Sequence, residues 1–276
     1  MGMMKRDFWL RVIIVGAGAV LFLLLFFADK TNLDGKESLA VQETIPSPET
    51  SVANLPPFPE DQPLKGQVER LPNVEGDRKL ALLDSIVAEL RSLDLYPFAA
   101  DFAAQKLQLQ SSLPNRLETG GLARRAMELD YVQSDSVLAR RYRDLVIFAL
   151  EPVVQEDPEN EQALLDLGLA YIRSQAPMQG ILSVRKVLEI NPKNVEAAFR
   201  LGEFSLQTGQ IDKAIQRFET VLSVENDHYP AMYGLAVALA QANRSGEAKS
   251  YLEQVIDKTP EDDLRKLASD LLNQID

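Results

Sequence analysis

The sequence predicts an all-α protein, in which antiparallel helix pairs stack into an α-solenoid with a C-terminal capping helix, preceded by one transmembrane helix and a disordered linker. From Asp77 onward, apolar residues recur three and four positions apart, as along one face of a helix, and no alternating strand pattern appears. Joints between helices recur at a constant interval of about 34 residues, at Asp157-Pro158, Asn191-Pro192 and Thr259-Pro260. In the joint between the last two, Asn226 occupies the position that proline holds elsewhere.

The composition excludes several classes of function. The chain has 41 acidic and 29 basic residues, and a net charge of -12 is the wrong sign for binding nucleic acid through its phosphates. It has no cysteine and a single histidine, His228, so thiolate nucleophiles and zinc clusters cannot form. His228 lies in a joint and is expected to be a surface or capping residue. We therefore expect neither enzyme activity nor a cofactor.

Residues 12–28 are predicted to be a transmembrane signal anchor. The run from Val12 to Ala28 carries no charge, and residues 8–10 extend it if Arg11 reaches the headgroups, which gives about 21 residues or roughly 31 Å. A cleaved secretory signal would share the basic start and the apolar run. Bulky Phe26 and Phe27, however, stand where cleavage requires small residues.

The orientation of this span follows from the basic residues around it. Lys5, Arg6 and Arg11 precede the span, whereas Lys30 and Lys36 follow it among acidic residues. The positive-inside rule then places residues 1–11 in the cytoplasm and the remainder outside. We expect a single-pass protein of a bacterial inner membrane with its C-terminal domain in the periplasm.

Residues 29–77 are predicted to be a Pro-rich disordered linker. They hold seven of the 15 prolines and no sustained apolar period, so this segment is not expected to bury itself. The LPPFP stretch at residues 55–59 could dock in an aromatic groove, although a solvated spacer explains it more simply.

Residues 78–160 are predicted to be a helical region. Leu80, Leu83, Val87 and Leu90 mark one apolar face, and Asp77 stands where a residue could cap the helix. Pro97 is expected in the first turn of the next helix.

Two further features bear on this region. Gly120-Gly121 is the expected small-residue contact of a degenerate repeat. Pro152 is expected to bend or shorten the helix that contains it.

Small residues recur in phase between the joints. Leu167-Gly168 aligns with Leu201-Gly202 and Leu235-Ala236, and Gly180 aligns with Ala214 and Ala248. Two helices pack closely only where a small side chain lets their backbones approach.

The segment from Gly209 to Asn226, GQIDKAIQRFETVLSVEN, resembles the tetratricopeptide repeat (TPR) family most closely, and GEAKSYLEQVIDKTP from Gly246 follows. The resemblance implies TPR units at 161–194, 195–228 and 229–262, with a capping helix at 263–276. It implies one or two degenerate units within 78–160. Ser205 departs from the family pattern, because this position usually holds a larger residue.

In this family the first helix of each unit lines a concave face. Carried over to this chain, the partner-binding positions would be Leu165, Leu169, Ile172, Arg173, Phe199, Glu203, Leu206, Gln207, Tyr233, Val237 and Gln241. Such an apolar face is expected to receive a peptide or helix of a partner. Alternatively, these residues cover one another, or the upstream helices or a second copy cover them. A grip on a terminal carboxylate is disfavoured because leucines occupy its positions.

The sequence is also similar to single-span TPR proteins of bacterial envelopes, and APMQGI at 176–181 looks like those of Bacteroidota. The resemblance implies a non-catalytic, membrane-anchored scaffold or adaptor in envelope protein assembly or chaperoning. An assembly factor for cytochrome c maturation, secretion or division is one alternative. Homo-oligomerisation in a structural role is another, and an enzyme is the least favoured.

Overall fold

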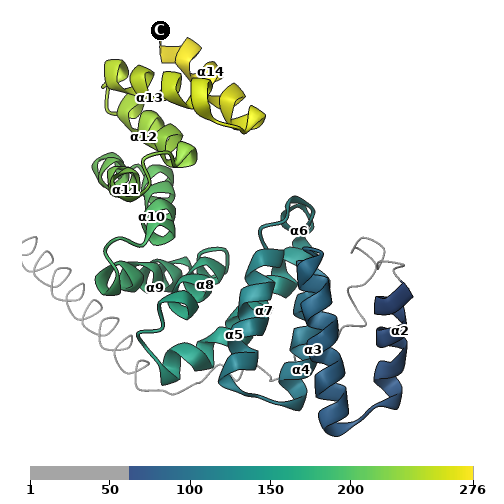
Figure 1. Cartoon of the computed structure of the whole chain (residues 1–276). Coiled ribbons are helices and arrows are strands. Elements are labelled where there is room, and N and C mark those ends of the chain that lie inside the picture. Colours follow the sequence, from purple (N-terminus) through teal and green to yellow (C-terminus); the bar gives the residue numbers. More distant parts are fainter. Residues whose placement is uncertain (1–61, 276) are drawn as a thin grey trace, which may run out of the picture. The chain divides into compact units, whose positions relative to one another are not determined.

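The computed structural model describes residues 62–275, which form helices and short connections without a strand (Figure 1). The elements are α2 (Gln62–Arg70), η3 (Leu71–Asn73), α3 (Gly76–Ser92), α4 (Tyr96–Leu109), α5 (Leu113–Ala126), α6 (Asp130–Ser134), α7 (Ser136–Glu156), α8 (Glu161–Ile172), α9 (Pro177–Ile190), α10 (Val195–Gln207), α11 (Ile211–Val224), α12 (Tyr229–Gln241), α13 (Ser245–Lys258) and α14 (Asp262–Ile275). The all-α prediction is confirmed for these residues.

The expected span at 12–28 and most of the expected linker lie outside the described residues. Within 62–275, no helix combines the length and the apolar character that crossing a bilayer requires.

Three helix pairs repeat at the constant interval that the joints predicted. Their first helices, α8, α10 and α12, begin at Glu161, Val195 and Tyr229, and their second helices, α9, α11 and α13, keep the same spacing. Each helix packs against its own partner, and α14 packs on α13 and α12. The predicted TPR-like solenoid is therefore confirmed in this part of the chain.

The repeat period extends to the helix caps. Asn160, Asn194 and His228 occupy the same position in successive repeats, and each accepts a hydrogen bond from the backbone N–H three residues later, at 3.0, 2.8 and 3.1 Å. Such a bond satisfies a donor that has no partner within the helix. His228 accepts through Nδ1, so its expected capping role is confirmed.

Small residues set the spacing within the pairs, as the sequence predicted. A Cβ atom added to Gly180 on α9 would lie 2.3 Å from the carbonyl oxygen of Gly168 on α8. In the next pair, a Cβ atom on Gly202 would lie 2.8 Å from the Phe218 ring. At Gly180 the two backbones therefore approach too closely for a larger side chain, and at Gly202 the Phe218 ring occupies the space that a side chain would need.

The upstream helices also form pairs. α3 packs on α4, and α5 packs on α7; the short α6 connects α5 to α7 in the chain and packs on α7. Gly120 lies against Leu150 at the contact between α5 and α7, where an added Cβ would be 2.4 Å from the leucine Cγ, whereas Gly121 faces open space. Only the first of the two glycines serves the expected close contact.

Pro152 does not shorten its helix, because α7 continues to Glu156. A proline has no N–H for the carbonyl four residues earlier, which here belongs to Phe148. Arg116 on α5 donates from Nη1 to that oxygen at 3.5 Å. A side chain of the neighbouring helix thus replaces the missing backbone donor.

Two predictions near the start of the described chain are wrong. The linker was expected to reach residue 77, but 62–73 are helical, with Leu64 and Leu71 buried against the neighbouring helices. Proline at the start of a helix loses no hydrogen bond, which is how Pro72 fits into η3. The cap residue of α3 is Glu75 rather than Asp77, which lies in the first turn and makes no cap hydrogen bond.

The apolar core consists of two clusters, and α8 contributes to both. Ala163 and Leu167 of α8 belong to the cluster of α2–α8, whereas Leu164 and Leu165 belong to the cluster of α8–α14. α8 therefore ties the upstream helices to the regular repeats.

Candidate partner-binding surface

The residues predicted for the concave face lie on α8, α10 and α12, and their accessibility differs. Leu165 is only 3% exposed and packs in the core, so the prediction that it contacts a partner is wrong. The Leu165 side chain packs in the apolar cluster of α8–α14 and does not face solvent. Phe199 is half-buried, and the centroid of its ring lies 5.9 Å from that of Phe218 and 4.9 Å from that of His228.

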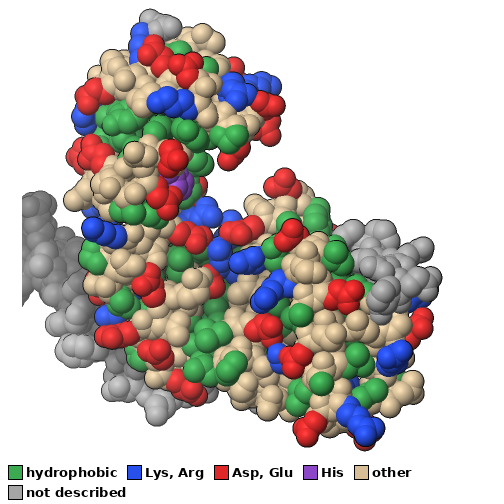
Figure 2. Space-filling view, in the orientation of Figure 1, with side chains coloured by type: hydrophobic (Ala, Val, Ile, Leu, Met, Phe, Trp, Pro, Cys, Tyr) green, Lys and Arg blue, Asp and Glu red, His purple; other side chains and the backbone are tan. Residues whose placement is uncertain are grey.

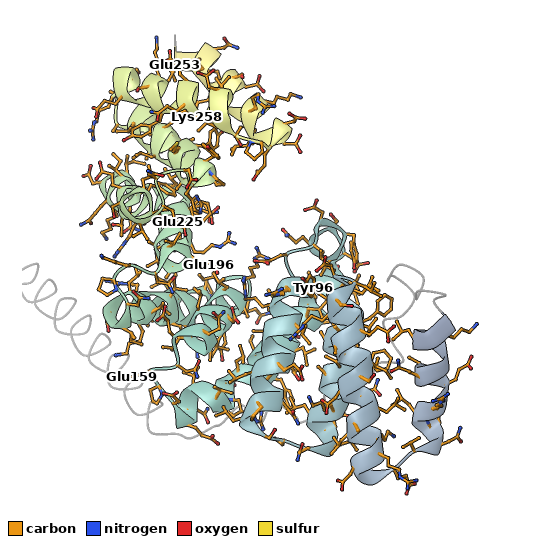
Figure 3. The ribbon with its side chains drawn as sticks, in the orientation of Figure 1. Tyr96, Glu159, Glu196, Glu225, Glu253 and Lys258 are labelled. Atoms are coloured by element: carbon orange, nitrogen blue, oxygen red, sulfur yellow. The ribbon has the colours of Figure 1, made fainter. Side chains whose placement is uncertain are left out.

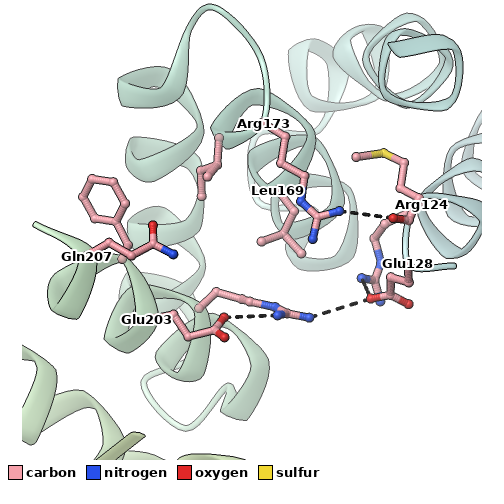
Figure 4. A pocket seen from close by; sticks show the side chains of 10 residues that line it. Arg124, Glu128, Leu169, Arg173, Glu203 and Gln207 are labelled. Carbon is pink, nitrogen blue, oxygen red and sulfur yellow. Dashed lines mark hydrogen bonds and ion pairs between the residues drawn. The ribbon is translucent and has the colours of Figure 1, made fainter. Parts of the chain in front are cut away.

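A pocket of about 90 Å³ lies between α5, α8 and α10 (Figure 4). Its lining includes five of the predicted residues, which are Leu169, Ile172, Arg173, Glu203 and Gln207. Leu169 and Ile172 are half-buried and provide an apolar floor, whereas Gln207 is exposed at the edge. The structure therefore brings part of the predicted surface together at one site.

Sequence reasoning missed the other half of this lining. Arg124, Met127 and Glu128 come from the end of α5 and the residues after it, and Arg200 and Phe204 come from α10. α5 lies outside the recognisable repeats, so no spacing in the sequence links it to α8. The alternating charge of Arg124 and Glu128 was the available signal, but it is equally typical of a solvated helix face.

Arg124 joins the three helices electrostatically. Its Nε lies 2.6 Å from Oδ1 of Asp166 on α8, and its Nη1 lies 2.6 Å from Glu128 and 3.2 Å from Glu196 on α10. Gln162 also donates to Asp166, at 2.9 Å. Burial raises the pKa of Asp166 to about 6, although Arg124 opposes the shift.

Arg200 and Arg173 form the rest of the rim. Arg200 pairs with Glu203 at 3.1 Å and approaches Glu128 to 3.8 Å, and Arg173 donates to the backbone oxygen of Met127 at 3.2 Å (Figure 4). Burial and the nearby Arg200 lower the pKa of Arg173. The upstream helix α5 therefore covers one edge of the concave face, which is one of the alternatives that the sequence left open.

Charges of both signs mix around this pocket. Over the face shown in Figure 2, acidic and basic side chains are interspersed. The pocket does not present a net cationic surface, because its three arginines lie among four carboxylates, those of Glu128, Asp166, Glu196 and Glu203.

The predicted residues of α12 lie apart from the pocket. Tyr233, Val237 and Gln241 are not among its lining residues. Tyr233 is half-buried, and burial together with Asp270 on α14 raises its pKa. Leu206 on α10 is also half-buried and does not line the pocket.

Two observations on the described residues concern metal sites and perturbed carboxylates. No group of three or more His, Cys, Asp or Glu side chains in 62–275 is arranged to hold a metal ion. The most strongly perturbed carboxylate near the pocket, Asp166, is 3% exposed and already bound to Arg124 and Gln162. Its position suits a structural ion pair.

Comparison with known proteins places the repeats in a family. The tetratricopeptide repeat model TPR_19 matches residues 183–222 and 206–271. Superkiller complex protein 3 of Mus musculus is 25% identical over 115 residues, which is 39% of this chain and 7% of that protein. Tetratricopeptide repeat protein 21B of Homo sapiens is 25% identical over 137 residues, 50% of this chain and 10% of that protein. The chain therefore spans a tenth or less of these relatives.

Solved structures show the same fold. A tetratricopeptide repeat protein from Parabacteroides merdae superposes with a TM-score of 0.56 and 17% identity, covering 76% of this chain and 77% of its own. MamA superposes with a TM-score of 0.50 and 18% identity, covering 62% and 93%. The matched family model and the evenly spaced, capped helix pairs identify residues 183–271 as tetratricopeptide repeats, and the solved structures share the fold of these stacked helix pairs.

Proposed function

We propose that this chain is a non-catalytic scaffold or adaptor that binds a partner protein through the concave face of α8, α10 and α12. A fold of stacked TPR units is that of a protein-binding scaffold, because it offers a large curved surface without reactive groups. We also propose that residues 12–28 anchor the chain in a bacterial inner membrane, with the repeats on the periplasmic side.

The pocket between α5, α8 and α10 carries this proposal. Leu169 and Ile172 are half-buried apolar side chains that keep some surface open to a ligand. The volume of about 90 Å³ suits one apolar side chain of a partner rather than a cofactor. Around it, Arg173, Arg200 and Glu203 offer polar groups that would orient the partner's backbone and side chains.

Site-specific photocrosslinking in cells tests the proposal. The photoreactive residue p-benzoylphenylalanine replaces Gln207 beside the pocket or Gln241 on α12, both of which are exposed. Glu253, exposed on α13 (Figure 3), is the matched control. We expect the same crosslinked partner from Gln207 and Gln241 and none from Glu253. A partner captured only from Glu253 would contradict the proposal.

The membrane anchor requires its own experiment. The uncharged run and the basic residues before it support a cytoplasmic N-terminus. Alkaline phosphatase, which is active only after export, is fused after Asp276, and green fluorescent protein, which fluoresces in the cytoplasm, is fused in parallel. We expect an active phosphatase and no fluorescence. The reverse pattern would refute the proposed orientation.

A further inference from the structure

A second groove, of about 430 Å³, lies between α9, α10 and α11. Its floor includes the buried residues Ile181, Leu201 and Ser205. Met178 and Arg185 of α9 stand on one side, and Lys213 and Arg217 of α11 stand on the other. Only Phe204 lines both this groove and the concave-face pocket. The groove is therefore a separate surface.

The groove exists because one repeat departs from the others. The position of Ser205 is occupied by Tyr171 in the preceding repeat and by Leu239 in the following one, and both are large and buried. In this repeat the large side chain comes one residue earlier, at Phe204, where the others have alanine. A shift of one residue turns a side chain by about 100° around the helix axis. Ser205 thus leaves unfilled the space that its counterparts occupy.

The groove carries positive charge without nearby compensation. Within the described residues, neither Arg185 nor Arg217 has a carboxylate within 4.0 Å, and Glu189, one turn along α9, pairs with Lys186 at 3.7 Å. Lys213 donates to Gln210 at 2.7 Å rather than to an acid. Burial and the neighbouring Arg185 lower the pKa of Arg217.

An apolar side chain stands beside these cations. Met178 is 63% exposed, although methionine is usually buried in a packed helix pair. An exposed methionine next to an apolar floor suits contact with a partner, because its flexible thioether adapts to different shapes.

We propose that this groove binds an acidic peptide segment of a partner protein that carries an apolar side chain. The apolar side chain enters the space over Ser205, against Ile181, Leu201 and Met178. Carboxylates on either side of it pair with Arg185 and Arg217, which donate charge-assisted hydrogen bonds. This interaction is independent of the concave face and gives the scaffold a second docking surface.

Fluorescence anisotropy with the full chain in a mild detergent tests this proposal. The probe is a fluorescein-labelled peptide that repeats the unit Glu-Glu-Leu-Glu-Asp-Phe twice, and a second probe replaces every acidic residue by Gln. We expect saturable binding of the acidic probe, and binding at least about tenfold weaker for the neutral probe.

Three variants locate the binding. Arg185→Glu/Arg217→Glu reverses the charge of the groove, and Ser205→Tyr fills it with the side chain that the preceding repeat carries. Each should weaken binding of the acidic probe at least about tenfold. Lys258→Glu/Lys266→Glu changes the net charge equally at exposed positions on α13 and α14, outside the groove lining, and should leave affinity unchanged. Far-UV circular dichroism of each variant checks that the helices are intact.

The alternatives give different results. No saturable binding at millimolar probe, or equal affinities for all variants, overturns the proposal. Binding that appears only after deletion of residues 29–61 would mean that this chain's own acidic segment occupies the groove, which also overturns it. If vesicles of anionic lipid bind through Arg185 and Arg217 while the peptide does not, the groove contacts a membrane surface instead. Gln207→Glu changes the concave-face pocket and not the groove lining, so it should not affect this assay. A failure of the groove proposal would therefore leave the concave-face proposal untouched.

Discussion

Replacing Gly180 by alanine adds one methyl group at the closest approach between α8 and α9. The added Cβ would lie 2.3 Å from the oxygen of Gly168 and 2.5 Å from the backbone nitrogen of Ile172, whereas ordinary contacts begin at 3.4 Å. Both neighbours are backbone atoms of α8, so no side chain can rotate away. The two helices must therefore separate locally by about 1 Å, which forfeits up to about half of the dispersion energy across the gap.

The expected magnitude follows from two opposing effects. Overpacking of this kind costs about 1–3 kcal/mol, and a clash with backbone atoms belongs at the upper end. Alanine offsets about 1 kcal/mol, because it is the better helix former. We expect Gly180→Ala to lower the free energy of unfolding by about 2 kcal/mol.

Gly121 provides a matched control. It also lies inside a helix, α5, but an added Cβ would have no atom within 4 Å. Gly121→Ala should therefore raise the free energy of unfolding by about 0.5–1 kcal/mol. Urea unfolding of the full chain, followed by far-UV circular dichroism, measures both changes. If the two variants shift the midpoint in the same direction, the close approach of α8 and α9 is refuted.

Three further predictions concern stability. The pKa of Asp166 in the folded chain is raised to about 6, so its contribution to stability is present below its unfolded pKa and is lost as pH rises toward neutrality. Between pH 4 and pH 7, the free energy of unfolding of the wild type should fall by up to about 3 kcal/mol relative to Asp166→Asn. A difference in urea midpoints that does not change with pH would contradict this prediction. Pro152→Ala gives the Phe148 oxygen a backbone N–H in addition to the long bond from Arg116, and it should raise the free energy of unfolding by about 1–3 kcal/mol. An unchanged or lower urea midpoint would show that Arg116 already compensates fully. Ala214→Trp places a large ring at a fully buried position and should lower the free energy of unfolding by at least about 1–3 kcal/mol. Lys213→Trp, at an exposed position, should lower it little. Equal melting temperatures of the two variants would count against the repeat alignment.

The repeat region could be predicted in detail because its contacts are local in sequence. Each helix packs mainly on its neighbours along the chain, so the period, the small residues and the joints carry the information that places them. Gly168 and Gly180 are twelve residues apart and meet directly. His228 could be expected at the surface or at a cap because it lies in a joint, and the structure shows that it makes the same cap hydrogen bond as Asn160 and Asn194.

The candidate sites were less predictable. The family pattern pointed to Leu169, Ile172 and Arg173, but it also included Leu165, which the fold buries. The spacing of the family's positions along a helix indicates which residues face inward or outward in an average repeat, but not in every repeat. Irregularities such as Phe204-Ser205 change the local surface, and their effect depends on which neighbouring side chains fill the space.

The sequence by itself determined that the chain is helical from Asp77 onward, where its three regular helix pairs begin, and which small residues let the backbones meet. Only the tertiary structure decided that Arg124 of α5 reaches Asp166 and Glu196, that 62–73 join the folded region, and that Ser205 opens a groove beside Arg185 and Arg217. The physical reason is the range of the interactions. Helix formation and pairing follow the period of the repeat, whereas Arg124 pairs with residues of other repeats, whose approach no local pattern encodes. The groove and the burial of 62–73 depend on how individual side chains of neighbouring helices fill space, which the average repeat pattern does not specify.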